Sequence, residues 1–148
     1  MRSWNNNAYS DAQVSNKSKR VTRHFSDLDL FFTRKPSTSD VNIIHDVVAI
    51  KRSVRNLILL NHHEKPFHPE IGGGVRGMLF QPLTIVVAQV LSQKIRMVID
   101  TYEPRVELED VMVVPKYSQN AFDVNILFNI INAPRDVQTI ELMLERLR

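Results

Sequence analysis

Glu103 and Arg105 are the residues whose types and spacing best suit chemistry, and they flank Pro104 in the segment Tyr102-Glu103-Pro104-Arg105-Val106. Pro104 disfavours the helical conformation of the preceding residue and lacks a backbone N–H, so a helix arriving from Pro82 should end here. In an extended chain, residues two apart point to the same side, so the carboxylate and the guanidinium should lie side by side.

Two interpretations of this pair stay open from the spacing. A surface ion pair, which spacing alone favours, would contribute about 0–1 kcal/mol and have no other role. A docking element would instead offer one acceptor and one forked donor to a partner protein.

A second group with possible chemistry lies in residues 61–70, which contain three histidines and two glutamates. Imidazole and carboxylate groups are zinc ligands. However, the adjacent His62 and His63 diverge unless the backbone bends, and two prolines stiffen the segment instead of folding it back. A solvated loop is therefore favoured over a metal site, and we expect no metal and no other cofactor.

All four glycines fall in Gly72-Gly73-Gly74-Val75-Arg76-Gly77, which matches the pattern G-x-G-x-x-G. A dinucleotide site also requires a strand before the glycines, a helix after them and an acid about 20 residues later at a strand end. Here prolines precede the glycines, and the nearest such acid, Asp100, lies in a predicted helix. We therefore expect a close backbone approach or a positive φ instead of a phosphate loop.

Paired carboxyls offer a third chemistry. Glycoside hydrolysis requires two carboxyls about 5–9.5 Å apart, one of them with a raised pKa, and Glu103 with Glu107 or Asp110 can meet the distance. These acids lie among charges at a corner that we expect to be exposed. The sequence also has no serine in a nucleophile elbow and no cysteine. An enzyme is therefore not the favoured interpretation.

Two long helices position these residues. Apolar residues that recur at intervals of three and four predict a helix from about Val41 to Leu60, capped by Ser37 with Asp40, or by Asp40 alone. A second helix should run from Pro82, in its first turn, to Tyr102. Its polar stripe is narrow, so we expect it to be packed on most sides, by its own sheet or by another chain.

Strands dominate the rest of the chain. Alternating residues predict strands over 106–114, with a bulge at Glu109-Asp110, and over 122–130, followed by a turn at 133–136. The same alternation predicts a last strand over residues 139–147. A helix through Val137, Ile140, Leu144 and Leu147 is the alternative. Residues 25–32 predict a short N-terminal strand or arm. The sum is an α+β fold: two long helices and a short helical turn packed on a C-terminal antiparallel β-meander.

Length and charge bound the remaining possibilities. The 148 residues suit one domain with a sizeable core, and no apolar run reaches the ~18 residues that a membrane span requires. Residues 1–24 carry five Lys/Arg against one acid, whereas residues 103–148 carry five against eight. We expect a disordered basic tail over 1–20, a single domain over 21–148, no secretory signal and no membrane or nucleic-acid partner.

Three segments together resemble a known family: Lys65-Pro66-Phe67-His68-Pro69-Glu70-Ile71-Gly72, Leu79-Phe80-Gln81-Pro82 and Tyr102-Glu103-Pro104-Arg105-Val106. They are similar to the lysozyme-like baseplate wedge family of contractile-tailed phages, which has relatives in type VI secretion baseplates. The resemblance covers about residues 25–148, and its most specific mark is Glu-Pro-Arg at a helix-to-strand junction. The family often has a more basic pair where this chain has Glu64-Lys65.

The resemblance implies a non-enzymatic structural protein of the virion tail baseplate, assembled in the host cytoplasm in multiple copies with six-fold symmetry. Its partners would be other baseplate wedge proteins, whose helical bundle seats Glu103, Pro104 and Arg105. The tail sheath protein would join the last strand, at Ile140, Leu142 and Leu144, so that the protein acts as a sheath initiator. The residues with expected structural roles are Pro66, Phe67, Pro69, Gly72 and Pro82. A peptidoglycan-hydrolysing tail enzyme is the alternative.

Overall fold

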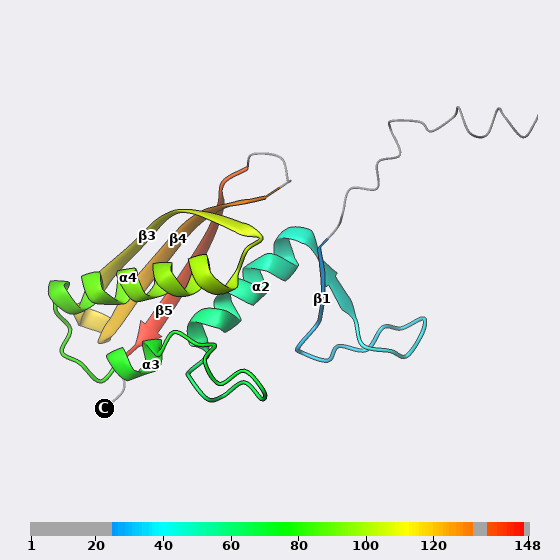
Figure 1. Ribbon diagram of the computed structural model, residues 1–148, viewed down its shortest axis with the longest axis horizontal. Helices are drawn as coiled ribbons and strands as arrows, with labels where there is room; N and C mark the ends of the chain where they lie inside the picture. Colours follow the sequence, from blue (N-terminus) through cyan, green and yellow to red (C-terminus); the bar gives the residue numbers. More distant parts are fainter. Residues whose placement is uncertain (1–24, 132–135, 147–148) are drawn as a thin grey trace, which may run out of the picture.

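The computed structural model describes residues 25–131 and 136–146 (Figure 1). The elements are β1 (Ser26–Leu28), β2 (Ile43–His45), α2 (Asp46–Leu59), α3 (Val75–Met78), α4 (Ile85–Tyr102), β3 (Val106–Lys116), the 3-10 turn η2 (Tyr117–Gln119), β4 (Ala121–Ile130) and β5 (Gln138–Glu145). They confirm the predicted α+β fold. The predicted tail over 1–20 lies outside the described residues. No helix of the described segments is long and apolar enough to cross a membrane.

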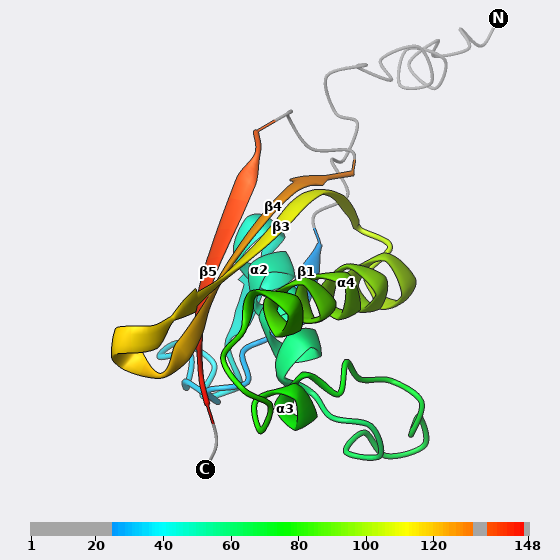
Figure 2. The ribbon, with the colours of Figure 1, turned by 90° about the vertical axis from the view of Figure 1, so that its left-hand side faces the viewer.

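The C-terminal meander is an antiparallel sheet in the order β3-β4-β5. The register of β3 against β4 shifts between Leu108 and Asp110, so the predicted bulge is confirmed. The last segment is a strand and not the alternative helix, and of the predicted turn over 133–136 only Asp136 lies within the described residues. Helices α2 and α4 cover one side of the sheet (Figure 2).

The core lies between the inner face of the sheet and these two helices. Strand β4 supplies the largest fully buried side chains, Phe122 near its start and Phe128 near its end. The helices contribute residues at helical spacing: Ile50, Val54 and Ile58 from α2, and Leu91, Ile95 and Ile99 from α4. Each of these six side chains is at most 1% exposed, so burial of apolar surface fixes both helices on the sheet.

The N-terminal end of α2 differs from the prediction. Residues 43–45 pair with residues 26–28 as a second, two-stranded sheet, and the helix begins at Asp46 and not at Val41. The predicted cap is also wrong, because Asp40 Oδ1 accepts from the amide of Val41 in the hairpin loop. The β-branched residues before Asp46 favour a strand once a partner strand is available. Figure 1 shows this β1–β2 hairpin beyond α2, away from the main sheet.

Helix α4 starts later than predicted and ends where predicted. Thr84 is its N-cap and accepts a 3.2 Å hydrogen bond from the amide of Val87, so Pro82 precedes the helix. Tyr102 is the last helical residue, as expected from Pro104. The elements of the described segments leave one side of α4 uncovered, where the exposed apolar residues are Ile85 (65%), Val86 (67%), Val90 (41%) and Met97 (69%).

Gly72 allows the chain to return against the C-terminal end of α2. A Cβ atom at Gly72 would lie 2.6 Å from the carbonyl carbon of Asn61, and the φ of Gly72 is +150°. The next amide, of Gly73, donates to the carbonyl oxygen of Leu60 at 3.1 Å. The predicted close backbone approach is therefore confirmed.

Candidate functional site

The segment from Glu103 to Arg105 is a stiff corner between α4 and β3. The amide of Glu103 donates to Ile99 O at 2.9 Å, which closes the last turn of the helix. On the other side, the amide of Ile131 donates to Arg105 O at 3.0 Å, which joins the corner to the end of β4. Pro104 lies exposed between the two fixed residues.

Glu103 and Arg105 form a forked ion pair inside the protein. Arg105 Nε donates to Glu103 Oε1 at 2.6 Å, and Nη2 donates to Oε2 at 2.8 Å. Ser53 of α2 donates a third hydrogen bond, 2.5 Å long, to Oε2. The predicted side-by-side placement is confirmed, but the predicted extended conformation is wrong, because residues 103–106 form a turn in which the amide of Val106 donates to Glu103 O at 3.2 Å. A surface ion pair is excluded, because Glu103 is 3% exposed and both of its oxygens already accept hydrogen bonds within the chain.

The pair is held in its charged state. Burial raises the pKa of Glu103, whereas the hydrogen bonds from Arg105 and Ser53 lower it. The lowering is the larger effect in sum, so the pKa of Glu103 lies below its ordinary value. The hydrogen bond to Glu103 raises the pKa of Arg105 despite its partial burial. A general acid of a glycosidase needs the opposite, a carboxyl with a raised pKa. The geometry therefore does not suit Glu103 for acid catalysis.

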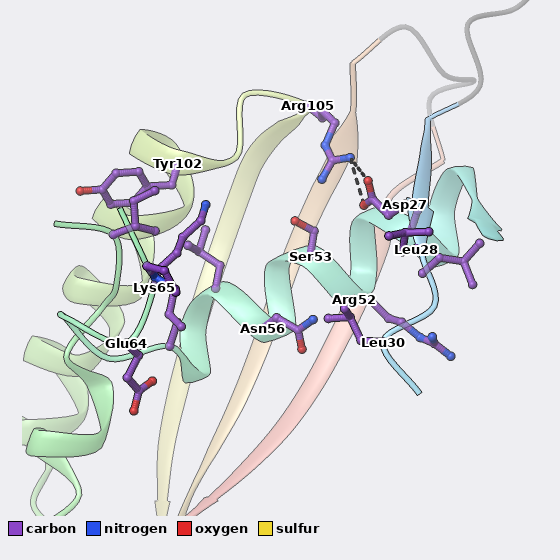
Figure 3. Close-up of a pocket in the computed structure, with 16 residues that line it drawn as sticks. Asp27, Leu28, Leu30, Arg52, Ser53, Asn56, Glu64, Lys65, Tyr102 and Arg105 are labelled. Atoms are coloured by element: carbon purple, nitrogen blue, oxygen red, sulfur yellow. Dashed lines mark hydrogen bonds and ion pairs between the residues drawn. The ribbon is translucent and has the colours of Figure 1, made fainter. Parts of the chain in front are cut away.

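Arg105 also reaches the N-terminal hairpin. Its Nη1 lies 3.4 and 3.3 Å from the two carboxylate oxygens of Asp27 on β1 (Figure 3). Its guanidinium carbon lies 5.8 Å from the centre of the Phe25 ring, within the range of a cation–π contact. The side chain of Arg105 is 23% exposed and that of Asp27 is 38% exposed. One guanidinium thus joins the corner to β1.

A second arginine–carboxylate cluster, missed by sequence reasoning, ties the same hairpin to α2. Asp29 is 4% exposed and accepts hydrogen bonds from Thr33 Oγ1, Arg52 Nη1 and the amide of Phe31. The hydrogen bond from Thr33 is the main reason that the pKa of Asp29 lies below its ordinary value. Arg52 also stacks over the ring of Phe31, with its guanidinium carbon 4.6 Å from the ring centre. The available signal in the sequence was the alternation of Asp27 and Asp29 with apolar residues in the N-terminal strand region.

An open groove of about 820 Å³ runs along α2 beside the corner. One wall is the hairpin, with Leu28 and Leu30, and the opposite wall is the loop that carries Glu64 and Lys65 (Figure 3). Arg105 lines the groove as well. The same side of α2 therefore presents a groove that is continuous with the corner.

The residues expected to be structural lie in and near this loop. Residues 62–70 are exposed, which confirms a solvated loop, and His68 pairs with Glu70 at 3.1 Å. No three His, Asp or Glu residues of residues 25–131 and 136–146 are grouped so that they could hold a metal ion. Pro66 lines the groove, whereas Phe67 is 97% exposed with a φ of 66°, and Pro69 and Pro82 are exposed. Gly72 has the structural contact described above.

The last strand presents its backbone and not its apolar side chains. Ile140, Leu142 and Leu144 are 4–7% exposed and face the core. Because Arg146 N donates to Asn120 O at 2.9 Å, the hydrogen-bonded pairs alternate along β4 and β5 from that point. Leu142 and Leu144 bond to β4, and the N–H and C=O of Met143 point away from it. Among the described residues, β5 pairs with β4 alone, and no described strand lies along its other edge.

Comparison with known proteins gives this geometry a context. The sequence profile of the family described as baseplate wedge protein gp25 matches residues 45–135, more than half of the chain. Baseplate wedge protein gp25 of Enterobacteria phage T4 is 29% identical over 124 residues, which cover 84% of this chain and 93% of the T4 protein.

Solved structures share the fold. A chain in the cryo-EM structure of the anti-feeding prophage baseplate has a TM-score of 0.59 at 18% identity and covers 84% of this chain and 88% of its own length. A proposed tail lysozyme from Geobacter sulfurreducens has a TM-score of 0.56 at 18% identity, covering 65% of this chain and 88% of its own. At such identity the likeness shows the fold alone. Since the family profile spans α2 to the end of β4, the chain belongs to the baseplate wedge protein gp25 family, structural proteins of the contractile phage tail baseplate.

Proposed function

We propose that this protein docks on other baseplate wedge proteins through the corner at Glu103, Pro104 and Arg105, in multiple copies around a six-fold baseplate. The buried fork of Glu103 and Arg105 is the observation that carries the proposal. It fixes the exposed Pro104 and the exposed edge of Arg105 in one orientation, and a preorganised surface loses less conformational entropy on binding.

The groove beside the corner suits a helix of the wedge core bundle. Its floor, α2, is 14 residues long, or about 21 Å at 1.5 Å per residue. The small residue Ser53 on its open side lets another helix approach closely, while Leu28 and Leu30 supply apolar contacts at the wall. An amphipathic helix laid in an apolar groove is a common mode of recognition.

A bulky residue in the groove tests this docking mode. Asn56 lines the groove and is exposed, whereas the neighbouring Arg55 is exposed on the same helix outside the groove. Asn56→Trp should therefore prevent co-purification with co-expressed wedge proteins, and Arg55→Trp should not. Equal co-purification of both variants would show that no partner occupies the groove.

We also propose that the edge of β5 accepts a strand of the tail sheath protein and so initiates sheath polymerisation. An unpaired edge offers a row of backbone donors and acceptors to another chain. Glu141 and Met143, whose backbone groups point outward, would supply them, while Ile140, Leu142 and Leu144 anchor the strand in the core. Backbone pairing would give the affinity, and alternate side chains would set the register.

Two proline substitutions separate this role of the edge from folding. Met143→Pro removes an outward N–H, so the domain should fold but sheath polymerisation on finished baseplates should fail. Leu142→Pro removes a bond to β4 and should unfold the domain. Normal sheath assembly by folded Met143→Pro would contradict strand addition at this edge.

The proposal is for a non-enzymatic protein, with peptidoglycan hydrolysis as the competing function. The likeness to a proposed tail lysozyme raises that alternative, but Glu103 is ionised and already hydrogen-bonded. Purified protein incubated with cell-wall material should release no soluble fragments. Release that disappears in Glu103→Gln would overturn the proposal.

A further inference from the structure

We infer that Arg105 is a positioning residue, which through Asp27 holds the β1–β2 hairpin in place as one wall of the groove. The inference rests on the proposed docking at the corner but assigns Arg105 an additional task. It would act on the partner through the hairpin as well as by direct contact.

The hairpin has little apolar packing of its own to fix its position. Each of its strands contains three residues, and an isolated two-stranded hairpin is marginally stable in water. Its large apolar residues mostly face outward: Leu28 is 63% exposed, Leu30 59% and Ile43 45%. Phe25 packs on the core at one end of the hairpin and β2 continues directly into α2, so side-chain contacts to the rest of the domain must position the remainder.

Two arginines make such contacts at successive acids of the same strand region. Arg105 approaches Asp27 from the corner, and Arg52 of α2 holds Asp29. Since the Nε and Nη2 atoms of Arg105 are fixed on buried Glu103, its Nη1 is directed at Asp27 without further loss of freedom. Glu103 thereby orients Arg105, and Arg105 orients the hairpin.

This arrangement makes the groove wall depend on the Glu-Pro-Arg corner. Leu28 follows Asp27 directly, and both line the groove together with Arg105. Loss of the Arg105–Asp27 contact should free the wall while the fork between Glu103 and Arg105 stays in place. A lysine at position 105 offers no fork, so it cannot hold both carboxylates in this geometry.

Asp27→Ala tests the inference, since it removes the hairpin contact and leaves the fork intact. Amide hydrogen exchange in residues 26–29 and 42–45 should rise several-fold, while exchange at Val106 and Ile131 beside the corner stays unchanged. Co-purification with co-expressed wedge proteins should fall about as far as in Arg105→Lys. Asp110→Ala is the control: it removes an exposed 3.4 Å contact with Arg96 and a local hydrogen bond from the amide of Val111, both away from the hairpin, and should change neither.

The outcomes separate the two proposals. Unchanged exchange in the hairpin of Asp27→Ala, or a freed hairpin with wild-type binding, would overturn the positioning role while the corner could still dock directly. Wild-type binding by folded Arg105→Lys would instead overturn docking at the corner itself. Loss of binding in both variants, with a freed hairpin in Asp27→Ala, is the result we expect.

Discussion

The corner at residues 103–105 and the edge of β5 present opposite kinds of surface. At the corner, the charged groups bond to one another and to Ser53 and Asp27 within the chain. At β5, the backbone groups of alternate residues face outward with no strand beside them in the described sheet. The first surface is suited to binding by shape and fixed orientation, and the second to binding by new hydrogen bonds. In the proposed function, one small domain would thus bind two partners by different physical means.

The largest expected effect on stability comes from Arg105→Ala. This change leaves the carboxylate of Glu103, which is 3% exposed, with Ser53 as its remaining side-chain donor. Removing one member of a buried ion pair costs about 3–5 kcal/mol, which lowers the thermal midpoint on the order of 10 °C in a domain of this size. Calorimetry measures both. A loss in the free energy of unfolding under about 1 kcal/mol would mean that Glu103 and Arg105 contribute no more than an exposed surface ion pair does.

Glu103→Ala should cost less than Arg105→Ala. Its loss leaves Arg105, which is 23% exposed and still faces Asp27, so the remaining charge keeps a partner and some water. We expect a loss of about 1–3 kcal/mol, the cost of leaving a hydrogen-bonding group unsatisfied, measured by urea unfolding. Glu107→Ala at an exposed position of β3 is the control and should stay within about 0.5 kcal/mol. A larger loss of stability in Glu103→Ala than in Arg105→Ala would mean that Arg105, and not Glu103, is the more deeply buried charge of the pair.

The pH dependence of stability sharpens the comparison further. Because the pKa of Glu103 is lowered on folding, its contribution is present above the ordinary value of 4.5 and is lost as the pH falls through the folded value. The difference in stability between the wild type and Arg105→Ala should therefore shrink in acid, where Glu103 becomes protonated. Thermal unfolding between pH 7 and pH 3 measures it, and a constant difference would exclude an ionised Glu103 as the cause.

The smallest expected effect is that of deleting residues 1–20, which lie outside the described residues. Their composition lacks apolar periodicity, so the thermal midpoint should stay nearly unchanged. A fall of several degrees would mean that they pack on the domain, because about 1 kcal/mol corresponds to several degrees here. If the shortened protein folds but assembles poorly, and more so at high salt, the segment binds a partner through its basic charge.

Local patterns in the sequence predicted most of the fold. The alternation in β3, β4 and β5 and the proline after α4 act within a few residues, and these elements were found with the correct type. The start of α2 was missed because residues 43–45 keep the apolar spacing of a helix, and their pairing with β1 joins segments far apart in the chain.

The site was predicted less completely for the same reason. Glu103 and Arg105, two positions apart, were correctly placed side by side, although a turn closed by the hydrogen bond from Val106 N to Glu103 O brings them together and not an extended chain. The burial of Glu103 depends on Ser53, fifty residues earlier, and Arg52 meets Asp29 across 23 residues. The alternating acids of the N-terminal strand could be seen in the sequence, but a single sequence does not show which distant side chain each acid meets.

Binding of the wild type and of Arg105→Lys to purified wedge proteins tests docking at the corner most directly. Arg105→Lys keeps the positive charge beside Glu103, so it should fold, which circular dichroism checks. Without the fork, the corner is no longer held in one orientation before binding, so binding should weaken by the cost of ordering it, and titration calorimetry should then detect little or no complex. Wild-type affinity in a folded Arg105→Lys variant would contradict docking through this corner.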